Sequence, residues 1–307
     1  MQNVIEVSNL SKSFGEKMVV ESISFAVNKG SLFAFLGQNG AGKTTTINMI
    51  IGLIRQNGGT ILYNGQPNFL DYKNKIGVVF QNNILEDLLT VEENLLTYGR
   101  LYIPSAKKVK ARFDEIVELL SLGGVVKQRF KTLSGGQRRK AEIARALFMS
   151  PEILFLDEPT TGLDPKTRAD VWEIMHRLKN ENGLTIFLTT HYMEETALAD
   201  NVAIIDQGKI IATGSPTELK SAYAYDKLLI TPNDAALLEY KLQALSVPWQ
   251  KTADVYTLRI DNTQASISLL YNLKEDIRFY EVIKGTMDDV FLAAVGKKVN
   301  ERGDAAV

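Results

Sequence analysis

The sequence predicts an α/β protein in which a core of parallel strands and helices is joined to smaller sheets. Three short apolar runs are typical of buried strands, at residues 31–36, 153–156 and 184–189. Residues 4–7 and 22–27 instead alternate apolar and polar side chains, the period of a half-buried strand. We therefore expect an N-terminal antiparallel sheet, a parallel core with a helical insertion at about residues 86–150, and a small α+β domain after residue 220.

Composition limits the possible function classes. The chain has 307 residues, enough for a large core and two domains. Its 35 basic and 36 acidic residues nearly cancel, so no strong field favours nucleic acid or an anionic membrane. It has no cysteine, which excludes disulfides and thiolate sites. The N-terminus lacks the features of a secretory signal, and no stretch approaches the ~20 apolar residues that span a bilayer. We expect a protein that is soluble by itself and reaches a membrane through a partner.

The first thirty residues are expected to form the antiparallel sheet. Its two strands lead through the turn Asn28-Lys29-Gly30 into the first buried strand. Phe14 lies in a predicted loop, Ser11 to Gly15. An exposed aromatic residue there would stack on a base, although a lone phenylalanine is more often a packing residue.

The segment after residue 36 has the pattern G-x-x-x-x-G-K-[ST] between a strand and a helix, as a phosphate-binding loop requires. Glycines let backbone N–H groups approach phosphate closely, and the helix N-terminus adds partial positive charge. Lys43 supplies a full charge to the β- and γ-phosphates, and the Thr44 hydroxyl suits Mg²⁺. A flexible turn with a surface lysine fits this context less well. The predicted phosphate-binding residues are Gly37, Gln38, Asn39, Gly40, Ala41, Gly42, Lys43, Thr44 and Thr45.

Two strands and the helical insertion come next. The strands are predicted at residues 60–63 and 75–80. Gln81 follows the second strand, where a side chain in an open α/β sheet faces a ligand; otherwise it is a solvated loop amide. Within the insertion, Thr90 and Glu93 have the spacing of a capping box. Apolar residues between 105 and 120 recur at helical spacing.

Two chemically informative segments follow the insertion. A helix is predicted to open at Ser134, Gly135, Gly136 and Gln137. N–H groups and a hydroxyl at a helix start can bind an anion, or the helix is simply capped there. The buried run at 153–156 ends in Asp157 and Glu158. Asp157 lies where a Mg²⁺ carboxylate belongs in a phosphate-loop enzyme. Glu158 can polarise a water aimed at the γ-phosphate.

A turn, a strand and a hairpin complete the core. Asp164 is expected to cap the helix that starts at Pro165. His191 follows the strand at 184–189. A lone histidine is usually structural, but this one lies on the presumed ligand side of the sheet, where it would contact phosphate. A hairpin is predicted from residues 202–206 and 209–213.

Together these motifs closely resemble the nucleotide-binding subunit of an ABC transporter, over roughly residues 1–220. They are GQNGAGKTT, LSGGQ, ILFLDEP and TGLDP, followed by His191, all in the family's order. LSGGQ is highly specific. The resemblance implies the phosphate-loop NTPase core of ABC ATPases, with an N-terminal antiparallel β-subdomain and a helical insertion. It also implies ATP and Mg²⁺ as cofactors.

The resemblance assigns roles to the residues of the phosphate site. Lys43 contacts phosphate and Thr44 binds Mg²⁺. Gln81 senses Mg²⁺ and the attacking water. Asp157 is the Mg²⁺ carboxylate, and Glu158 is the general base. ATP hydrolysis is therefore the expected activity.

Further roles concern the rest of the nucleotide. Phe14 takes the place of the aromatic residue that stacks on adenine, and His191 contacts the γ-phosphate. Ser134 and Gly136 contact ATP bound to the other subunit, and Asp164 belongs to the loop that joins the two sites. Because the chain has one copy of each motif, a complete site implies a head-to-tail dimer. The second subunit is another copy or a paralogous ATPase subunit.

The resemblance also implies partners. A separate transmembrane permease would hold the protein at the cytoplasmic side of the cell membrane. Residues 81–90 would dock that permease or pack internally. The run Arg138-Arg139-Lys140 departs from the more usual sequence and is expected to alter surface contacts without touching the chemistry. The alternatives are a soluble ABC-type ATPase acting on ribosomes or nucleic acid, and a regulatory module that holds ATP without turnover. We expect no nucleic acid partner.

An accessory domain is predicted at residues 221–297. Its strand and helix patterns follow the order β-α-β-β-α-β, as in a ferredoxin-like domain. Residues 286–296 resemble the C-terminal helix of drug- and antibiotic-exporting members, which favours export; otherwise this helix only covers the added domain. The polar tail at 298–307 is expected to be disordered.

Overall fold

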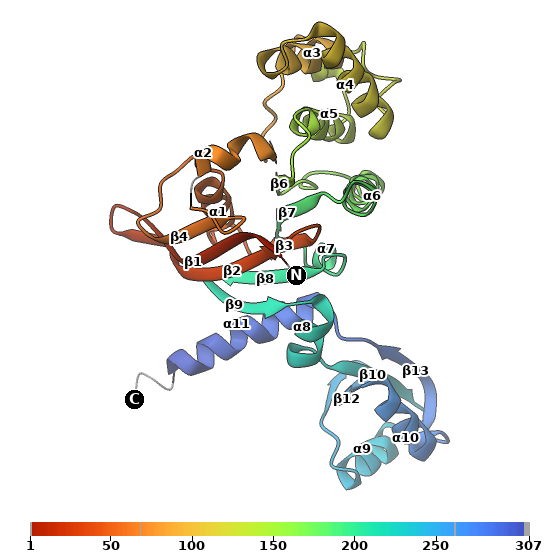
Figure 1. The fold of residues 1–307 in the computed structure, drawn as a ribbon. Helices are drawn as coiled ribbons and strands as arrows, with labels where there is room; N and C mark the ends of the chain where they lie inside the picture. The colour runs from red at the N-terminus through yellow and green to blue at the C-terminus, as the bar shows by residue number, and fades with distance from the viewer. Residues whose placement is uncertain (1, 68, 261, 304–307) are drawn as a thin grey trace. The chain divides into compact units, whose positions relative to one another are not determined.

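The computed structural model describes residues 2–67, 69–260 and 262–303. The chain divides into two compact units, residues 1–213 and 214–307 (Figure 1). Each unit has its own sheets and its own hydrophobic core. In the described part of the chain, no helix is both long enough and apolar enough to cross a membrane.

A six-stranded sheet forms the centre of the first unit. Its strand order is β5-β6-β7-β3-β8-β9, and the pairs from β5 to β8 are parallel. The strands are β3 (Leu32–Leu36), β5 (Ile76–Val79), β6 (Ile153–Asp157), β7 (Thr185–Thr190), β8 (Asn201–Asp206) and β9 (Lys209–Gly214). Every residue of β3, β6 and β7 is buried, which explains their apolar sequences. The predicted parallel core is confirmed.

The second sheet of this unit is antiparallel, in the order β2-β1-β4. Its strands are β1 (Asn3–Phe14), β2 (Lys17–Asn28) and β4 (Gly58–Tyr63), and the short α2 (Phe69–Tyr72) follows them. Phe25 of this sheet stacks on Phe33 of β3 at 5.4 Å, so the two sheets share one core. The predicted loop at residues 11–15 is wrong in part, because β1 continues to Phe14, which pairs with Lys17. Irregular register between residues 7 and 13 of β1 hides the strand period from the sequence.

Helices connect these strands, and three of them form the helical insertion (Figure 1). The insertion helices are α3 (Val91–Tyr102), α4 (Ala106–Leu119) and α5 (Gly135–Leu147); the others are α1 (Lys43–Ile50), α6 (Pro165–Asn182) and α7 (Met193–Thr196). The predicted capping box is confirmed: Thr90 Oγ1 accepts from Glu93 N at 3.1 Å, and Thr90 N donates to the Glu93 carboxylate at 2.8 Å. Asp164 caps α6 as predicted, and Pro165 is its first residue.

The second unit is a four-stranded antiparallel sheet in the order β11-β12-β10-β13. Its elements are α8 (Pro216–Tyr223), β10 (Asp226–Pro232), α9 (Ala235–Ala244), β11 (Trp249–Thr252), β12 (Val255–Ile260), α10 (Thr263–Leu273), β13 (Ile277–Ile283) and α11 (Met287–Gly303). From β10 to β13 the order is β-α-β-β-α-β, and β12 lies between β10 and β11, as in a split βαβ fold. Helix α11 extends into the segment predicted to be disordered, and residues 304–307 lie outside the described residues.

Candidate active site

The phosphate-binding loop joins β3 to α1, and it is folded around the side chain of Lys43. Lys43 Nζ donates to the carbonyl oxygens of Gly37 at 2.8 Å and Gln38 at 3.1 Å. Gly42 has a left-handed φ of 109°, and a Cβ there would lie 2.9 Å from the carbonyl oxygen of Val19. Only glycine fits both conditions, so the loop can lie close to β2.

A cavity of about 640 Å³ opens beside this loop. Eight predicted site residues line it: Asn39, Gly40, Gly42, Lys43, Thr44, Thr45, Gln81 and Glu158. The predicted loop residues Gly37, Gln38 and Ala41 are not among its lining residues. Sequence reasoning missed the other wall, which consists of Lys17, Met18, Val19, Gln207 and Gly208. These residues come from β2 and from the β8–β9 turn, and no local motif marks them.

Glu158 is the centre of the polar contacts in the cavity. Its Oε1 lies 3.1 Å from Lys43 Nζ. Its Oε2 accepts from Gln81 Nε2 at 3.3 Å and from Thr161 Oγ1 at 3.1 Å. His191 Nδ1 lies 3.3 Å from the same Oε2. The structure therefore brings together Glu158, His191, Gln81 and Lys43, the four residues predicted to be catalytic.

The surroundings of Glu158 favour its ionised form. Burial raises the pKa of Glu158, but the hydrogen bond and charge of Lys43, the Thr161 hydroxyl and His191 lower it by more. The pKa of this carboxyl group therefore lies below its ordinary value. A carboxylate in this state is an acceptor for a proton from water.

The backbone around Glu158 is held by the neighbouring strand. Glu158 has a left-handed φ of 46°, which is uncommon for a residue with a side chain. Its N–H donates to Thr189 Oγ1 at 3.0 Å, and this hydroxyl donates to Asp157 Oδ1 at 2.6 Å. Thr189 of β7 thus fixes both acidic residues at the end of β6.

Arg139 is a second support that sequence reasoning missed. Its side chain is buried, and it donates to three carbonyl oxygens: Pro159 at 2.7 Å, Phe80 at 2.7 Å and Glu158 at 2.9 Å. Phe80 immediately precedes Gln81, so one guanidinium group joins the ends of β5 and β6. The expectation that the run at 138–140 affects only the surface is wrong. Hydropathy cannot show that an arginine turns inward to satisfy backbone carbonyl groups.

The residues predicted to bind the metal offer suitable ligands. Thr44 and Gln81 line the cavity, and Asp157 is buried at the end of β6, where it is not among the lining residues. Hydroxyl, amide and carboxylate oxygens are the ligands that Mg²⁺ takes. Among the described residues, no group of three or more His, Cys, Asp and Glu residues could hold a metal ion. This arrangement fits a cation that takes its remaining ligands from phosphate and water.

The other predicted residues do not line the cavity. Ser134, Gly135, Gly136 and Gln137 begin α5, and the Ser134 and Gln137 side chains form a capping box there. Asp164 accepts from Thr167 N at 3.1 Å at the start of α6. Phe14 is 53% exposed at the end of β1, with Lys12 Nζ 5.1 Å from its ring centre. Its neighbour in the hairpin, Lys17, does line the cavity.

The segment between Gln81 and α3 is anchored by α5. Glu142 Oε1 accepts from the backbone N–H groups of Ile84 at 2.7 Å and Leu85 at 3.0 Å. Leu85 is buried, whereas Ile84 is 48% and Leu88 68% exposed. Of the two interpretations for this segment, internal packing holds for Leu85, and an exposed apolar surface remains at Ile84 and Leu88.

Sequence comparisons identify relatives for both units. Residues 20–161 match the family described as ABC transporter, and residues 214–295 match the family described as ATP-binding protein DrrA1-3-like, C-terminal domain. The chain is 36% identical over 313 residues to the daunorubicin/doxorubicin resistance ATP-binding protein DrrA of Streptomyces peucetius, covering 97% of this chain and 94% of that one. It is 40% identical over 230 residues to the linearmycin resistance ATP-binding protein LnrL of Bacillus subtilis, covering 74% of each. It is 35% identical over 302 residues to the Nod factor export ATP-binding protein I of Burkholderia lata, covering 97% of this chain and 98% of that one.

Solved structures agree with these matches. The protein cbiO1 from Clostridium perfringens, part of the ABC transporter complex cbiONQ, aligns with a TM-score of 0.67 and 26% identity, covering 71% of this chain and 91% of that one. A bacterial ABC transporter cassette solved as a dimer aligns with a TM-score of 0.63 and 25% identity, covering 69% of this chain and 98% of that one.

Proposed function

The chain belongs to the ATP-binding subunits of ABC transporters, and from this premise we propose that two copies close head to tail around ATP and Mg²⁺ to drive export through a separate permease. It is an ATP hydrolase of this family. One observation carries the proposal for the site: Glu158 lies 3.1 Å from Lys43 Nζ and 3.3 Å from both Gln81 Nε2 and His191 Nδ1. The relatives named for drug resistance and for Nod factor export support the direction of transport.

In the proposed cycle, the phosphates of ATP take over Lys43 from Glu158. The Glu158 carboxylate keeps Gln81, Thr161 and His191 around it, and its lowered pKa leaves it ionised at neutral pH to accept a proton from water. Thr44, Gln81 and Asp157 would hold Mg²⁺, which neutralises charge on the β- and γ-phosphates when it is bound. The loop N–H groups would orient the triphosphate.

The separation of the motifs supports a second copy. Ser134, Gln137 and Asp164 do not line the cavity that contains Lys43 and Glu158. Ser134 and Asp164 are both exposed. A nucleotide site that uses both sets of residues therefore needs a second chain, and a homodimer would have two complete sites. A ligand bound between two chains shifts the population toward the dimer, and hydrolysis reverses that shift.

A permease and a membrane location complete the proposal. The exposed Ile84 and Leu88, which follow Gln81 in the segment that leads to α3, offer an apolar surface to a partner. A permease bound there would place the protein at the cytoplasmic face of the membrane. Because Gln81 begins this segment and contacts Glu158, a partner bound to it would link transport to the nucleotide site.

Light scattering of the Glu158→Gln variant tests the dimer. With ATP and Mg²⁺ this variant should be a stable dimer with no turnover, because the nucleotide binds but no carboxylate accepts the proton. The double variant Lys43→Ala, Glu158→Gln should stay monomeric, because it lacks the phosphate contact. A Glu158→Gln variant that stays monomeric with ATP would overturn the head-to-tail arrangement.

A pull-down from detergent-solubilised membranes tests the partner. Tagged protein from the native cell should recover a polytopic membrane protein in stoichiometric amount. Recovery of ribosomal proteins or nucleic acid without such a protein would instead favour a soluble ABC-type ATPase.

A further inference from the structure

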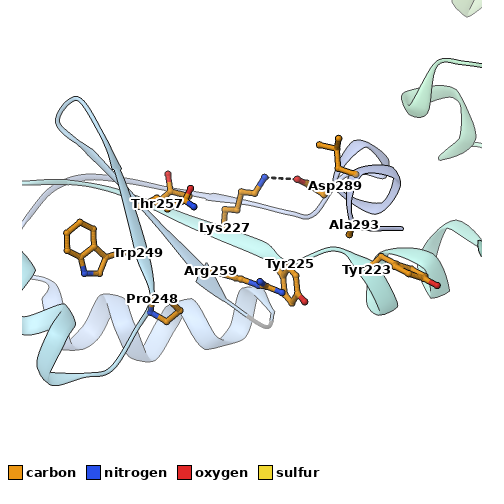
Figure 2. A pocket seen from close by; sticks show the side chains of 11 residues that line it. Tyr223, Tyr225, Lys227, Pro248, Trp249, Thr257, Arg259, Asp289 and Ala293 are labelled. Atoms are coloured by element: carbon orange, nitrogen blue, oxygen red, sulfur yellow. Dashed lines mark hydrogen bonds and ion pairs between the residues drawn. The ribbon is translucent and has the colours of Figure 1, made fainter. Parts of the chain in front are cut away.

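Carboxylates outside the nucleotide cavity tie separate elements of the fold together, and Asp289 and Glu195 illustrate two cases. In the C-terminal unit, Asp289 Oδ1 lies 2.7 Å from Lys227 Nζ, which joins α11 to β10 (Figure 2). Asp289 is half-buried, and this ion pair acts within that unit. In the first unit, Glu195 of α7 is only 2% exposed, and its partners lie beside two residues of the candidate active site. The contacts of Glu195 can therefore affect the chemistry.

The Glu195 side chain joins the ends of two neighbouring strands. Its Oε1 accepts from Thr160 Oγ1 at 2.5 Å, and its Oε2 accepts from Thr190 Oγ1 at 2.7 Å. Thr160 comes two residues after Glu158, and Thr190 is the last residue of β7, directly before His191. Both threonines are buried, so water cannot replace the carboxylate as the acceptor for their hydroxyl groups.

Thr190 fixes the backbone on both sides of His191. Its hydroxyl oxygen accepts from Tyr192 N at 3.0 Å, which closes a short turn around His191. Its carbonyl oxygen accepts from Gly37 N at 3.2 Å, so the same residue is joined to the phosphate-binding loop. A hydroxyl group has one proton, and because Thr190 donates it to Glu195, its lone pairs are left to face the Tyr192 N–H group. The carboxylate thus orients the hydroxyl group that holds the turn.

Thr160 belongs to the turn that follows Glu158. In this turn Thr161 N donates to the Glu158 carbonyl oxygen at 3.3 Å, and Leu163 N donates to the Thr160 carbonyl oxygen at 3.1 Å. Thr161 Oγ1 also donates to the Glu158 carboxylate at 3.1 Å. The hydrogen bond from Thr160 to Glu195 holds the middle of this turn, so it limits how far Thr161 and the Glu158 carboxylate can move.

Arg168 supplies the positive charge that a buried carboxylate needs. Its Nε lies 3.8 Å from Glu195 Oε1, and its Nη1 lies 3.0 Å from Glu194 Oε1. The Glu194 side chain is 63% exposed. Glu194 hydrogen-bonds to Arg168, whereas both threonine hydroxyl groups donate to Glu195. The two adjacent glutamates therefore separate the contact with the arginine from the contact with the threonines.

We propose that Glu195 is a positioning residue for ATP hydrolysis. By holding Thr160 and Thr190, it keeps His191 Nδ1 3.3 Å from the Glu158 carboxylate. Glu195 is not among the residues that line the nucleotide cavity, so it acts through its neighbours. This role rests on the functions proposed for Glu158 and His191.

Steady-state phosphate release by Glu195→Gln tests this role. The amide keeps the shape of the side chain but has one acceptor oxygen instead of two, so one threonine hydroxyl group loses its acceptor. We expect kcat per folded molecule to fall at least about tenfold, because a shift of about 1 Å can cost ~100-fold in rate. KM for ATP should change little, since Glu195 does not line the cavity.

Glu194→Gln is the control for this experiment. It removes a carboxylate from the same arginine without touching the threonines, and it should keep the kcat of the parent. Equal losses of kcat in Glu194→Gln and Glu195→Gln would overturn the proposal. An unchanged kcat in Glu195→Gln would also overturn it.

Substitutions at Thr190 separate positioning from stability. Thr190→Ser keeps the hydroxyl group and should keep kcat, whereas Thr190→Val removes it and should lose kcat about as much as Glu195→Gln. The double variant Thr190→Val, Glu195→Gln should lose less than the product of the two single effects, because both changes disrupt the same hydrogen bond. Equal rates for the serine and valine variants, or fully multiplicative effects, would overturn the proposal.

NMR of the His191 ring separates a failure of this role from a failure of the proposed function. The sequence has two histidines, so His176→Gln assigns the two ring signals. The His191 signal should shift in Glu195→Gln and stay in place in Glu194→Gln, whatever His191 contributes to hydrolysis. An unshifted signal in Glu195→Gln would overturn the positioning role. A His191→Ala variant that keeps its kcat would instead overturn the function proposed for His191.

Discussion

Arg139 offers a sharp test of how the active site is positioned. Its guanidinium group donates to the carbonyl groups of Phe80, Glu158 and Pro159, at the ends of two adjacent strands. In Arg139→Lys the shorter ammonium group can keep one of these bonds. Two lost bonds to a charged group, at about 1.5 kcal/mol each, predict a loss of about 3 kcal/mol in the free energy of unfolding.

The catalytic effect should exceed a mere loss of stability. Without Arg139 the ends of β5 and β6 can separate, which moves Gln81 away from Glu158. Because a shift of about 1 Å can cost ~100-fold in rate, we expect kcat per folded molecule to fall at least about tenfold. KM for ATP should change little, since Lys43 and the phosphate loop do not contact Arg139. Steady-state phosphate release and urea unfolding measure the two effects.

A second arginine supplies the control for this experiment. Arg112 binds the carbonyl groups of Leu147 at 2.6 Å and Phe148 at 3.3 Å, at the other end of α5. Arg112→Lys should therefore lower the stability without changing kcat. If Arg139→Lys loses stability but keeps its kcat, or if Arg112→Lys lowers kcat equally, Arg139 does not position the site.

Two further predictions concern the signature helix and Glu158. Gly136→Ala would place a methyl group 2.2 Å from Thr167 Cγ2, at a cost of about 1–3 kcal/mol in unfolding free energy. Thr167→Ser removes that Cγ2 and keeps the hydroxyl, so the double variant should regain most of the loss in urea unfolding; no recovery would exclude the clash. The pKa of Glu158 is lowered in the fold, so its ionisation stabilises the protein at neutral pH, and this is lost as the pH falls through the lowered pKa. The difference in unfolding free energy between the wild type and Glu158→Gln should shrink from pH 7 to below about 4, where unfolded glutamate is protonated; a constant difference would contradict this.

Local patterns predicted much of the fold. The Thr90–Glu93 capping box and the Asp164 cap form as expected, because each depends only on residues three positions apart. The buried strands could also be predicted from a local pattern, since a strand covered on both faces needs apolar side chains throughout. The sequence did not predict that β1 continues to Phe14, because the irregular register of this strand breaks the alternation of apolar and polar side chains.

Contacts between distant segments account for what the sequence could not predict. Arg139 turns inward to the ends of β5 and β6, and Thr189 binds the end of β6 from β7. Met18 and Gln207 line the nucleotide cavity from turns and strands far from any motif. Each of these roles depends on which strands are neighbours, and composition does not encode that.

The strand order explains why motifs far apart in the chain form one site. Gln81, Glu158, His191 and Lys43 follow β5, β6, β7 and β3, which are successive neighbours in the sheet. Because these strands are parallel, all four side chains come from the carboxyl edge, where ligands bind in open α/β sheets. Glu158 follows β6, an inner strand of this set, and its carboxylate contacts Gln81, His191 and Lys43. Its contacts with three of its neighbours' side chains therefore follow from topology, and a variant that separates β5 from β6 should weaken the Gln81 contact before the Lys43 contact.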